Sequence, residues 1–251
     1  MGSEIYFSTT GTGSPLILLH GFLENSKIWD PFLEELSLKR QVVCVDLPGH
    51  GNSENISTVH SMELMAEAVT SVLKHLKIEK ASFAGHSMGG YVALAILEKS
   101  PEMVKSITLI NSTPEEDSPE RRENRSRAVE LVRKNKSAYV SMSISNLLSP
   151  ANMGKFSFEI EEIKKEAQRL NSKGIIAALE GMKIRTNKEY VLQKANIPKI
   201  LISGKKDPIL NNDQLEIIAK ATGVAFFSLD GGHLFFIENK KELRKMLHFI
   251  D

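Results

Sequence analysis

Short apolar runs that alternate with amphipathic stretches restrict the possible fold of this sequence most. Six runs have the length and continuous hydrophobicity of strands buried on both faces, namely residues 15–20, 41–46, 81–84, 106–110, 198–203 and 224–229. Between them, residues 62–76, 88–97 and 215–221 place apolar side chains at the i, i+3, i+4 spacing of amphipathic helices. Strands that alternate with helices predict an α/β fold with a mostly parallel central sheet flanked by helices.

Two parts of the chain depart from this alternation. Residues 4–9 are expected to form an edge strand or hairpin that leads into the sheet. Residues 112–187 contain no strand pattern, only helix-like blocks at 119–135, 137–148, 157–170 and 173–184. The sequence therefore predicts an α/β core formed by residues 1–111 and 188–251, with an all-helical cap inserted at 112–187.

Charge and cysteine content exclude several classes of protein. The chain has 32 Lys and Arg against 31 Asp and Glu, and this balance argues against a nucleic-acid partner. No apolar run approaches the ~18 residues that a membrane helix needs, so no membrane association is expected. The single cysteine, Cys44, excludes an internal disulfide and is expected to be a buried strand thiol. Together with the lack of a signal-peptide pattern, this favours a cytoplasmic protein; the oligomeric state stays open.

The sequence Gly85-His86-Ser87-Met88-Gly89 carries the strongest chemical signal. It fits the pattern G-x-S-x-G, directly follows one strand-like run and directly precedes a helical one. That is the strand–turn–helix context of a nucleophile elbow, in which flanking glycines permit a tight turn. Ser87 would then lie at a helix N-terminus, where unpaired N–H groups favour developing negative charge.

A serine nucleophile needs a base, and the base needs an acid that orients it. Asp207 and His233 each follow a predicted strand, and the carboxyl ends of parallel strands are where α/β sheets bind ligands. Asp230 is set aside because it lies too close to His233 along the turn. Of the other histidines, His86 is expected to point away from Ser87, while His20 and His50 are expected to hold loops through hydrogen bonds.

An oxyanion hole and a substrate pocket complete the predicted site. The backbone N–H groups of Met88 and Phe22 are the expected oxyanion donors, since Met88 follows the nucleophile and Phe22 lies in the loop after the strand at 15–20. The residues expected to line the pocket are apolar: Leu23, Met142, Leu147, Leu210 and Leu234. No metal-binding motif is present, so neither a metal nor another cofactor is expected.

These motifs together resemble the α/β-hydrolase superfamily, and within it the serine esterase-like branch with a helical cap after the sixth sheet strand. The resemblance rests on His20-Gly21-Phe22, residues 46–53, the turn at 85–90, the loop around Asp207 and Gly232-His233, and on the chain order Ser, Asp, His. It implies that residues 46–53 form a loop beside the active site with a structural role. Related dehalogenases and epoxide hydrolases carry an Asp at the position of Ser87, so the resemblance does not extend to their activities.

The leading functional prediction is hydrolysis of a small carboxylic ester, thioester or lactone through an acyl-enzyme intermediate on Ser87. A first alternative is a C–C hydrolase, or a lyase of the menaquinone-synthesis type, that uses the same triad on an anionic metabolite. That alternative requires an arginine of residues 112–187 to turn inward and bind a carboxylate. A second alternative is a ligand sensor with a vestigial triad.

Overall fold

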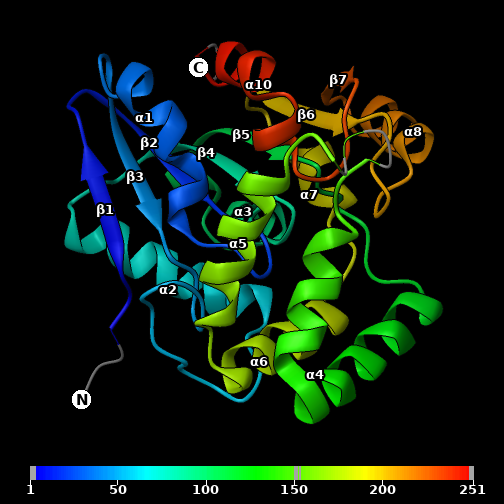
Figure 1. Cartoon of the computed structure of the whole chain (residues 1–251). Coiled ribbons are helices and arrows are strands. Elements are labelled where there is room, and N and C mark those ends of the chain that lie inside the picture. The colour runs from blue at the N-terminus through cyan, green and yellow to red at the C-terminus, as the bar shows by residue number, and fades with distance from the viewer. Residues whose placement is uncertain (1–3, 150–151, 153, 249–251) are drawn as a thin grey trace.

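A seven-stranded sheet forms the centre of the molecule (Figure 1). The computed structural model describes residues 4–149, 152 and 154–248. The strand order is β1-β3-β2-β4-β5-β6-β7; β1 is antiparallel to β3, and every other neighbouring pair is parallel. The strands are β1 (Phe7–Thr10), β2 (Ser14–Leu19), β3 (Arg40–Val45), β4 (Ala81–His86), β5 (Val104–Ile110), β6 (Lys199–Gly204) and β7 (Ala225–Leu229).

Helices flank the sheet in two groups, and the helices of each group pack against one another. In one group α1 packs against α10, and in the other α2, α3, α7 and α8 pack in series. Their bounds are α1 (Asp30–Leu36), α2 (Met62–His75), α3 (Met88–Lys99), α7 (Glu189–Lys194), α8 (Asn212–Thr222), α9 (Phe235–Glu238) and α10 (Lys240–His248), with short 3₁₀ turns at Ser26–Trp29 and Pro101–Met103. The predicted α/β fold with a mostly parallel sheet is confirmed.

Burial in the sheet follows strand position. β2 and β4 lie between other strands and are almost entirely buried, as their continuous apolar runs predict. β7 lies at the edge and is only partly buried, so Phe227 is 45% exposed. Cys44 is buried in β3, and burial raises the pKa of its thiol to about 12.

The lead-in takes one of its two expected forms, whereas the helical segment follows a different strand from the expected one. Residues 7–10 form one edge strand, not a hairpin, because Phe7–Thr10 pairs directly with β3. The helical segment follows the fifth strand, β5, and not the sixth as expected. A hairpin at the lead-in would have added one strand before it.

Helices α4 (Pro119–Ser145), α5 (Ser157–Gln168) and α6 (Ser172–Lys183) lie between β5 and β6 in the chain. The predicted break near residue 136 is present: Asn135 has the non-helical angles φ −156°, ψ 86°, and its side chain accepts a hydrogen bond from the Ala138 N–H at 3.0 Å. Residues 150, 151 and 153 of the predicted cap lie outside the described part of the chain.

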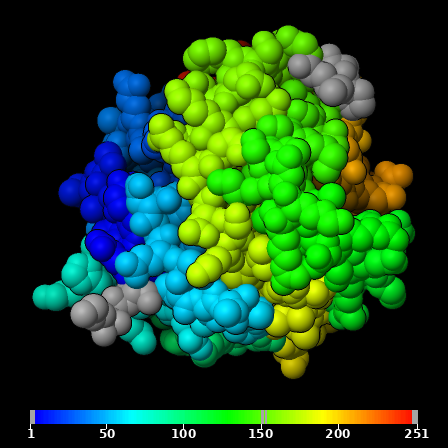
Figure 2. All heavy atoms as spheres, turned by 60° about the horizontal axis from the view of Figure 1, so that its bottom comes forward, coloured from blue at the N-terminus to red at the C-terminus, as the bar shows by residue number. Residues whose placement is uncertain are grey.

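The two ends of the helical segment meet. The Lys188 N–H donates to the Pro114 carbonyl at 2.7 Å, which closes the segment at its base. α4 packs against both α5 and α6. Figure 2 shows this segment, coloured green to yellow, over much of the face that looks toward the viewer. Within the described ranges, no helix is both long and apolar enough to cross a membrane.

Candidate active site

Ser87 lies on a strained turn between β4 and α3. Its φ of 49° and ψ of −113° are unusual for a residue with a side chain, and such strain is characteristic of a nucleophile elbow. The flanking glycines make the turn possible, because a Cβ atom on Gly85 or Gly89 would come within 2.4 Å of neighbouring backbone atoms. The Ser112 hydroxyl donates to the Ser87 carbonyl at 2.8 Å and holds the turn against the end of β5.

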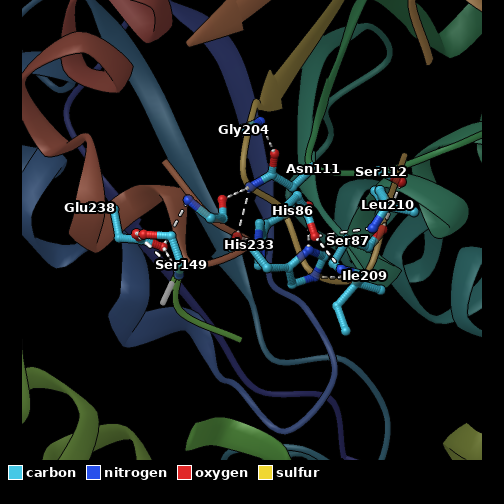
Figure 3. A network of polar contacts seen from close by, with 12 residues as sticks. His86, Ser87, Asn111, Ser112, Ser149, Gly204, Ile209, Leu210, His233 and Glu238 are labelled. Atoms are coloured by element: carbon cyan, nitrogen blue, oxygen red, sulfur yellow. Dashed lines mark hydrogen bonds and ion pairs between the residues drawn. The ribbon is translucent and has the colours of Figure 1, made fainter. Parts of the chain in front are cut away.

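The structure brings Ser87, His233 and Asp207 together (Figure 3 shows Ser87 and His233). Ser87 Oγ lies 3.0 Å from His233 Nε2, and His233 Nδ1 lies 2.7 Å from Asp207 Oδ2. With Nδ1–H donating to the carboxylate, Nε2 is left to accept the proton of the serine hydroxyl. These are the contacts that nucleophile, base and orienting acid require.

Both carboxylate oxygens of Asp207 are occupied. Oδ2 accepts from His233, while Oδ1 accepts from the N–H groups of Ile209 at 2.7 Å and Leu210 at 3.1 Å. Burial alone would raise the pKa of Asp207, but the interaction with His233 and these backbone donors outweigh burial and lower the pKa. Asp207 therefore stays ionised, as a partner for a protonated imidazole must.

The loop that carries His233 is held by side chains from other strand ends. Asn111, which follows β5, donates through Nδ2 to the carbonyls of Gly232 at 2.9 Å and His233 at 2.7 Å, and its Oδ1 accepts from the Gly204 N–H at 2.8 Å. Figure 3 shows Asn111 between Gly204 and His233. No local sequence pattern indicated this role for Asn111.

Glu24 and His86 form a buried pair beside this loop. Glu24 Oε2 lies 2.9 Å from His86 Nδ1 and accepts the Gly21 N–H at 2.6 Å, while His86 Nε2 lies 2.9 Å from the His233 carbonyl. Both ring nitrogens of His86 thus face acceptors, so both must carry protons and the ring is charged. His86 points away from the Ser87 hydroxyl, as expected.

The pKa values of the pair agree with an ionised contact. Burial alone would lower the pKa of His86, but the Glu24 carboxylate and the two hydrogen bonds raise it above 6.5. Burial alone would raise the pKa of Glu24, but the charge and hydrogen bond of His86 lower it below 4.5. The pair connects the loop after β2, through Gly21, to the backbone of His233.

Replacing Glu24 with glutamine is expected to cost about 3 kcal/mol of unfolding free energy near pH 5.5, because a buried ion pair loses one partner. Because the pKa of Glu24 is lowered in the folded protein, its contribution to stability is complete above about pH 4.5. Because the pKa of His86 is raised in the folded protein, its contribution to stability is complete below about pH 6.5. The loss should therefore be greatest between these values and shrink as the pH rises through the pKa of folded His86. Urea unfolding at several pH values measures it.

Glu67→Gln is the matched control, since Glu67 forms an exposed pair with Lys99 on the surface. Its stability should change little at any pH. A Glu24→Gln variant with the same pH–stability profile as wild type would contradict an ionised Glu24–His86 pair.

Two other predicted histidine roles are also met. His20 Nε2 accepts the Leu47 N–H at 2.9 Å, and Nδ1 lies 2.7 Å from the Gly21 carbonyl. The ring is therefore neutral and holds the two loops through hydrogen bonds. His50 Nδ1 lies 3.2 Å from the Pro48 carbonyl. Burial lowers the pKa of His20 and lowers that of His50 to about 3, so both stay uncharged.

The loop at 46–53 is held by similar contacts. The Asp46 carboxylate accepts the N–H groups of Ser26 and Asn52. All of these contacts are structural.

A cavity of about 340 Å³ opens over Ser87 and His233. Its wall combines residues of the α/β core with residues of α4 and α6: Phe22, Leu23, Glu24, Tyr91, Arg121, Asn124, Arg125, Ala128, Tyr139, Met142, Ser143, Asn146, Leu147, Leu179, Met182 and Ile209. Another cavity of about 350 Å³ shares Leu23 and Glu24 but lies toward α5 and α10 and does not include Ser87. The cavity over Ser87 is therefore the candidate substrate pocket.

The predicted pocket residues divide into two sets. Leu23, Met142 and Leu147 line the cavity. Leu210 and Leu234 do not, so this part of the expectation is wrong. Leu210 is buried with its N–H bound to Asp207, and Leu234 is completely buried in the core at the start of α9.

The predicted oxyanion donors lie in suitable places. Met88 is the first residue of α3, so its N–H has no partner within the helix. Phe22 lines the same cavity from the loop after β2. Their action on an oxyanion stays a prediction. Among the described residues, no group of three or more His, Cys, Asp and Glu side chains is arranged to hold a metal ion.

A parallel sheet with a serine elbow after one strand and a histidine after its last strand defines the α/β-hydrolase class. The chain matches the family described as alpha/beta hydrolase fold over residues 14–240 and belongs to it. A thermophilic esterase from Thermogutta terrifontis, solved with malate bound, is 31% identical with a TM-score of 0.92, and the match covers 98% of this chain and 92% of that one.

Curated proteins are also similar to this chain. A putative non-heme haloperoxidase of Mycobacterium phage D29 is 25% identical over 92% of this chain and 85% of its own length. A pimeloyl-[acyl-carrier protein] methyl ester esterase of Nitrosomonas europaea is 37% identical over 45% of this chain and 42% of its own length. Several further relatives are likewise matched over less than half of their length. The class of activity that these likenesses support is hydrolysis.

Proposed function

We propose that this chain is a serine hydrolase that cleaves small carboxylic esters, including thioesters and lactones, through an acyl-enzyme intermediate. One observation carries the proposal: the continuous contact from Ser87 Oγ to His233 Nε2 and from His233 Nδ1 to Asp207, at 3.0 and 2.7 Å, opening into a cavity. The esterases among its relatives lend it further support.

In the first half of the reaction Ser87 Oγ attacks the acyl carbon as its proton passes to His233 Nε2. The carbonyl oxygen becomes negatively charged, and the N–H groups of Met88 and Phe22 are the donors we assign to it. When this intermediate collapses, the bond to the leaving oxygen or sulfur breaks and the leaving group takes the proton from His233. Asp207 stabilises the imidazolium without accepting its proton.

In the second half a water molecule attacks the acyl-Ser87 ester. His233 Nε2 accepts a proton from the water and then returns it to Ser87 Oγ as the carboxylic acid leaves. The net reaction is ester plus water to acid plus alcohol, and every proton passes through His233. In a lactone the leaving hydroxyl remains on the acyl product.

We also propose that residues 112–187 act as a cap on a core formed by residues 1–111 and 188–251. The closing contact between Pro114 and Lys188 lies at the predicted boundaries. α4 and α6 supply much of the cavity wall, whereas Ser87, Asp207 and His233 come from the core. The core would therefore break the bond and the cap would select the substrate.

Labelling with a fluorophosphonate probe tests the proposed chemistry directly. An activated Ser87 should displace fluoride and form a bond from Oγ to phosphorus, which mass spectrometry of the peptide around Ser87 detects. Prior incubation with a p-nitrophenyl ester that acylates the enzyme should slow the labelling. Absence of labelling on Ser87 in folded protein would overturn the proposal and favour the ligand sensor.

A further inference from the structure

Three polar side chains near the start of α4 enter the wall of the cavity that contains Ser87: Arg121, Asn124 and Arg125. We propose that this wall, which we call the arginine wall, is a binding site for an anion and that the substrate is a small ester that carries a free carboxylate. The inference rests on the proposed ester hydrolysis at Ser87 and adds the substrate class.

Positive charge is in excess at the arginine wall. The buried Asp117 carboxylate interacts with three guanidinium groups: Arg125 through Nε and Nη2, Arg185 at 2.5 Å and Arg121 at 3.7 Å. Burial alone would raise the pKa of Asp117, but Arg125 and Arg185 lower it, so the carboxylate is ionised. One negative charge thus faces three positive charges, and a bound carboxylate would reduce the excess.

The arginines also have donors to spare. A guanidinium carries five N–H donors in a planar fork that suits a carboxylate. Arg125 gives two of them to Asp117. In the part of the chain that the structure describes, the Arg121 side chain donates no hydrogen bond, and it is 33% exposed. Arg185 lies behind the wall, with its guanidinium 4.2 Å from the centre of the Tyr91 ring.

Nothing else in the described lining cancels this charge. Glu24 is the one acidic residue there, and His86 balances it at 2.9 Å. Asp207 is not in the lining and faces His233. Much of the remaining lining is apolar, including Leu23, Leu147 and Leu179. Exclusion of water by such residues strengthens a charged hydrogen bond.

Matched pairs of esters, followed by titration of the acid released, test the inference. Monomethyl glutarate carries its carboxylate on the acyl side, and methyl glutaramate is its neutral amide isostere. O-Butyrylglycolate carries the carboxylate on the alcohol side, and O-butyrylglycolamide is its isostere. We expect kcat/KM for the carboxylate to exceed that for the amide by about 10- to 100-fold in at least one pair, the range of a charged hydrogen bond.

Arg121→Gln should bring that ratio close to one, because it removes the guanidinium whose N–H groups would bind the carboxylate. Asp117 keeps Arg125 and Arg185, so the variant should fold, and its thermal midpoint checks this. The ratio is taken within one protein, which cancels any general loss of activity. Arg122 forms an exposed pair with Glu116 outside the cavity. Arg122→Gln should therefore leave the ratio unchanged.

Two results would overturn the inference: wild-type ratios near one for both pairs, or a high ratio that Arg121→Gln leaves intact. In both cases the esters would still be hydrolysed in a reaction that depends on Ser87. If Ser87→Ala hydrolysed the esters as fast as wild type, or if wild type hydrolysed none of them, the proposed function would itself fail. The two failures are therefore distinguishable.

Discussion

Ser87→Ala is expected to lower kcat for p-nitrophenyl butyrate by about five orders of magnitude or more, because the acyl-enzyme has no oxygen on which to form. Among the described residues, the Ser87 hydroxyl forms one hydrogen bond, to His233, and the unusual backbone angles of Ser87 are no harder for alanine than for serine. The thermal midpoint should therefore stay nearly unchanged. Steady-state kinetics and thermal unfolding of the same preparation measure both quantities.

Ser71→Ala is the matched control, since Ser71 lies on α2 and its hydroxyl donates to the Ala68 carbonyl within the same helix. It should hydrolyse the same ester at the wild-type rate. Turnover by Ser87→Ala comparable to that of this control would exclude an acyl-Ser87 intermediate.

Asp207→Asn is expected to lower kcat by about 10⁴-fold, and the hydrogen bonds around Asp207 give the reason. Oδ1 accepts two backbone N–H groups, from Ile209 and Leu210. The asparagine must keep its carbonyl oxygen there, so its NH₂ group turns to His233 Nδ1. A histidine that accepts at Nδ1 carries its proton on Nε2 and cannot take the proton of Ser87.

Asp230→Asn is the sharpest control for this prediction. Asp230 is an acid close to His233 along the chain, but it is 75% exposed and pairs with Lys206. It should retain wild-type kcat for p-nitrophenyl butyrate. If Asp230→Asn caused the large loss and Asp207→Asn did not, the assignment of the orienting acid would be wrong.

Local sequence patterns predicted the positions of Ser87, Asp207 and His233, because each follows a strand-like run and parallel strands end at one edge of a sheet. The break at Asn135 was also predictable from the helix-like blocks that meet there. Edge strands were harder: β7 has an apolar sequence but lies at the side of the sheet, and periodicity does not reveal strand order.

Contacts between distant residues that belong to no motif were not predictable. Glu24 and His86 are 62 residues apart, and no spacing rule connects them. Leu210 and Leu234 were expected in the pocket, yet both side chains are buried and neither lines the cavity over Ser87. The direction of a side chain after a strand end depends on the loop backbone, which sequence periodicity does not describe.

The contact between Pro114 and Lys188 has a consequence for how such a protein diversifies. A segment whose ends adjoin can be exchanged for another without altering the distance that the rest of the chain must bridge. The arginine wall lies within that segment, whereas Ser87, Asp207 and His233 lie outside it. Exchange of this segment at its closed base would therefore change the substrate preference and leave the three core residues in place.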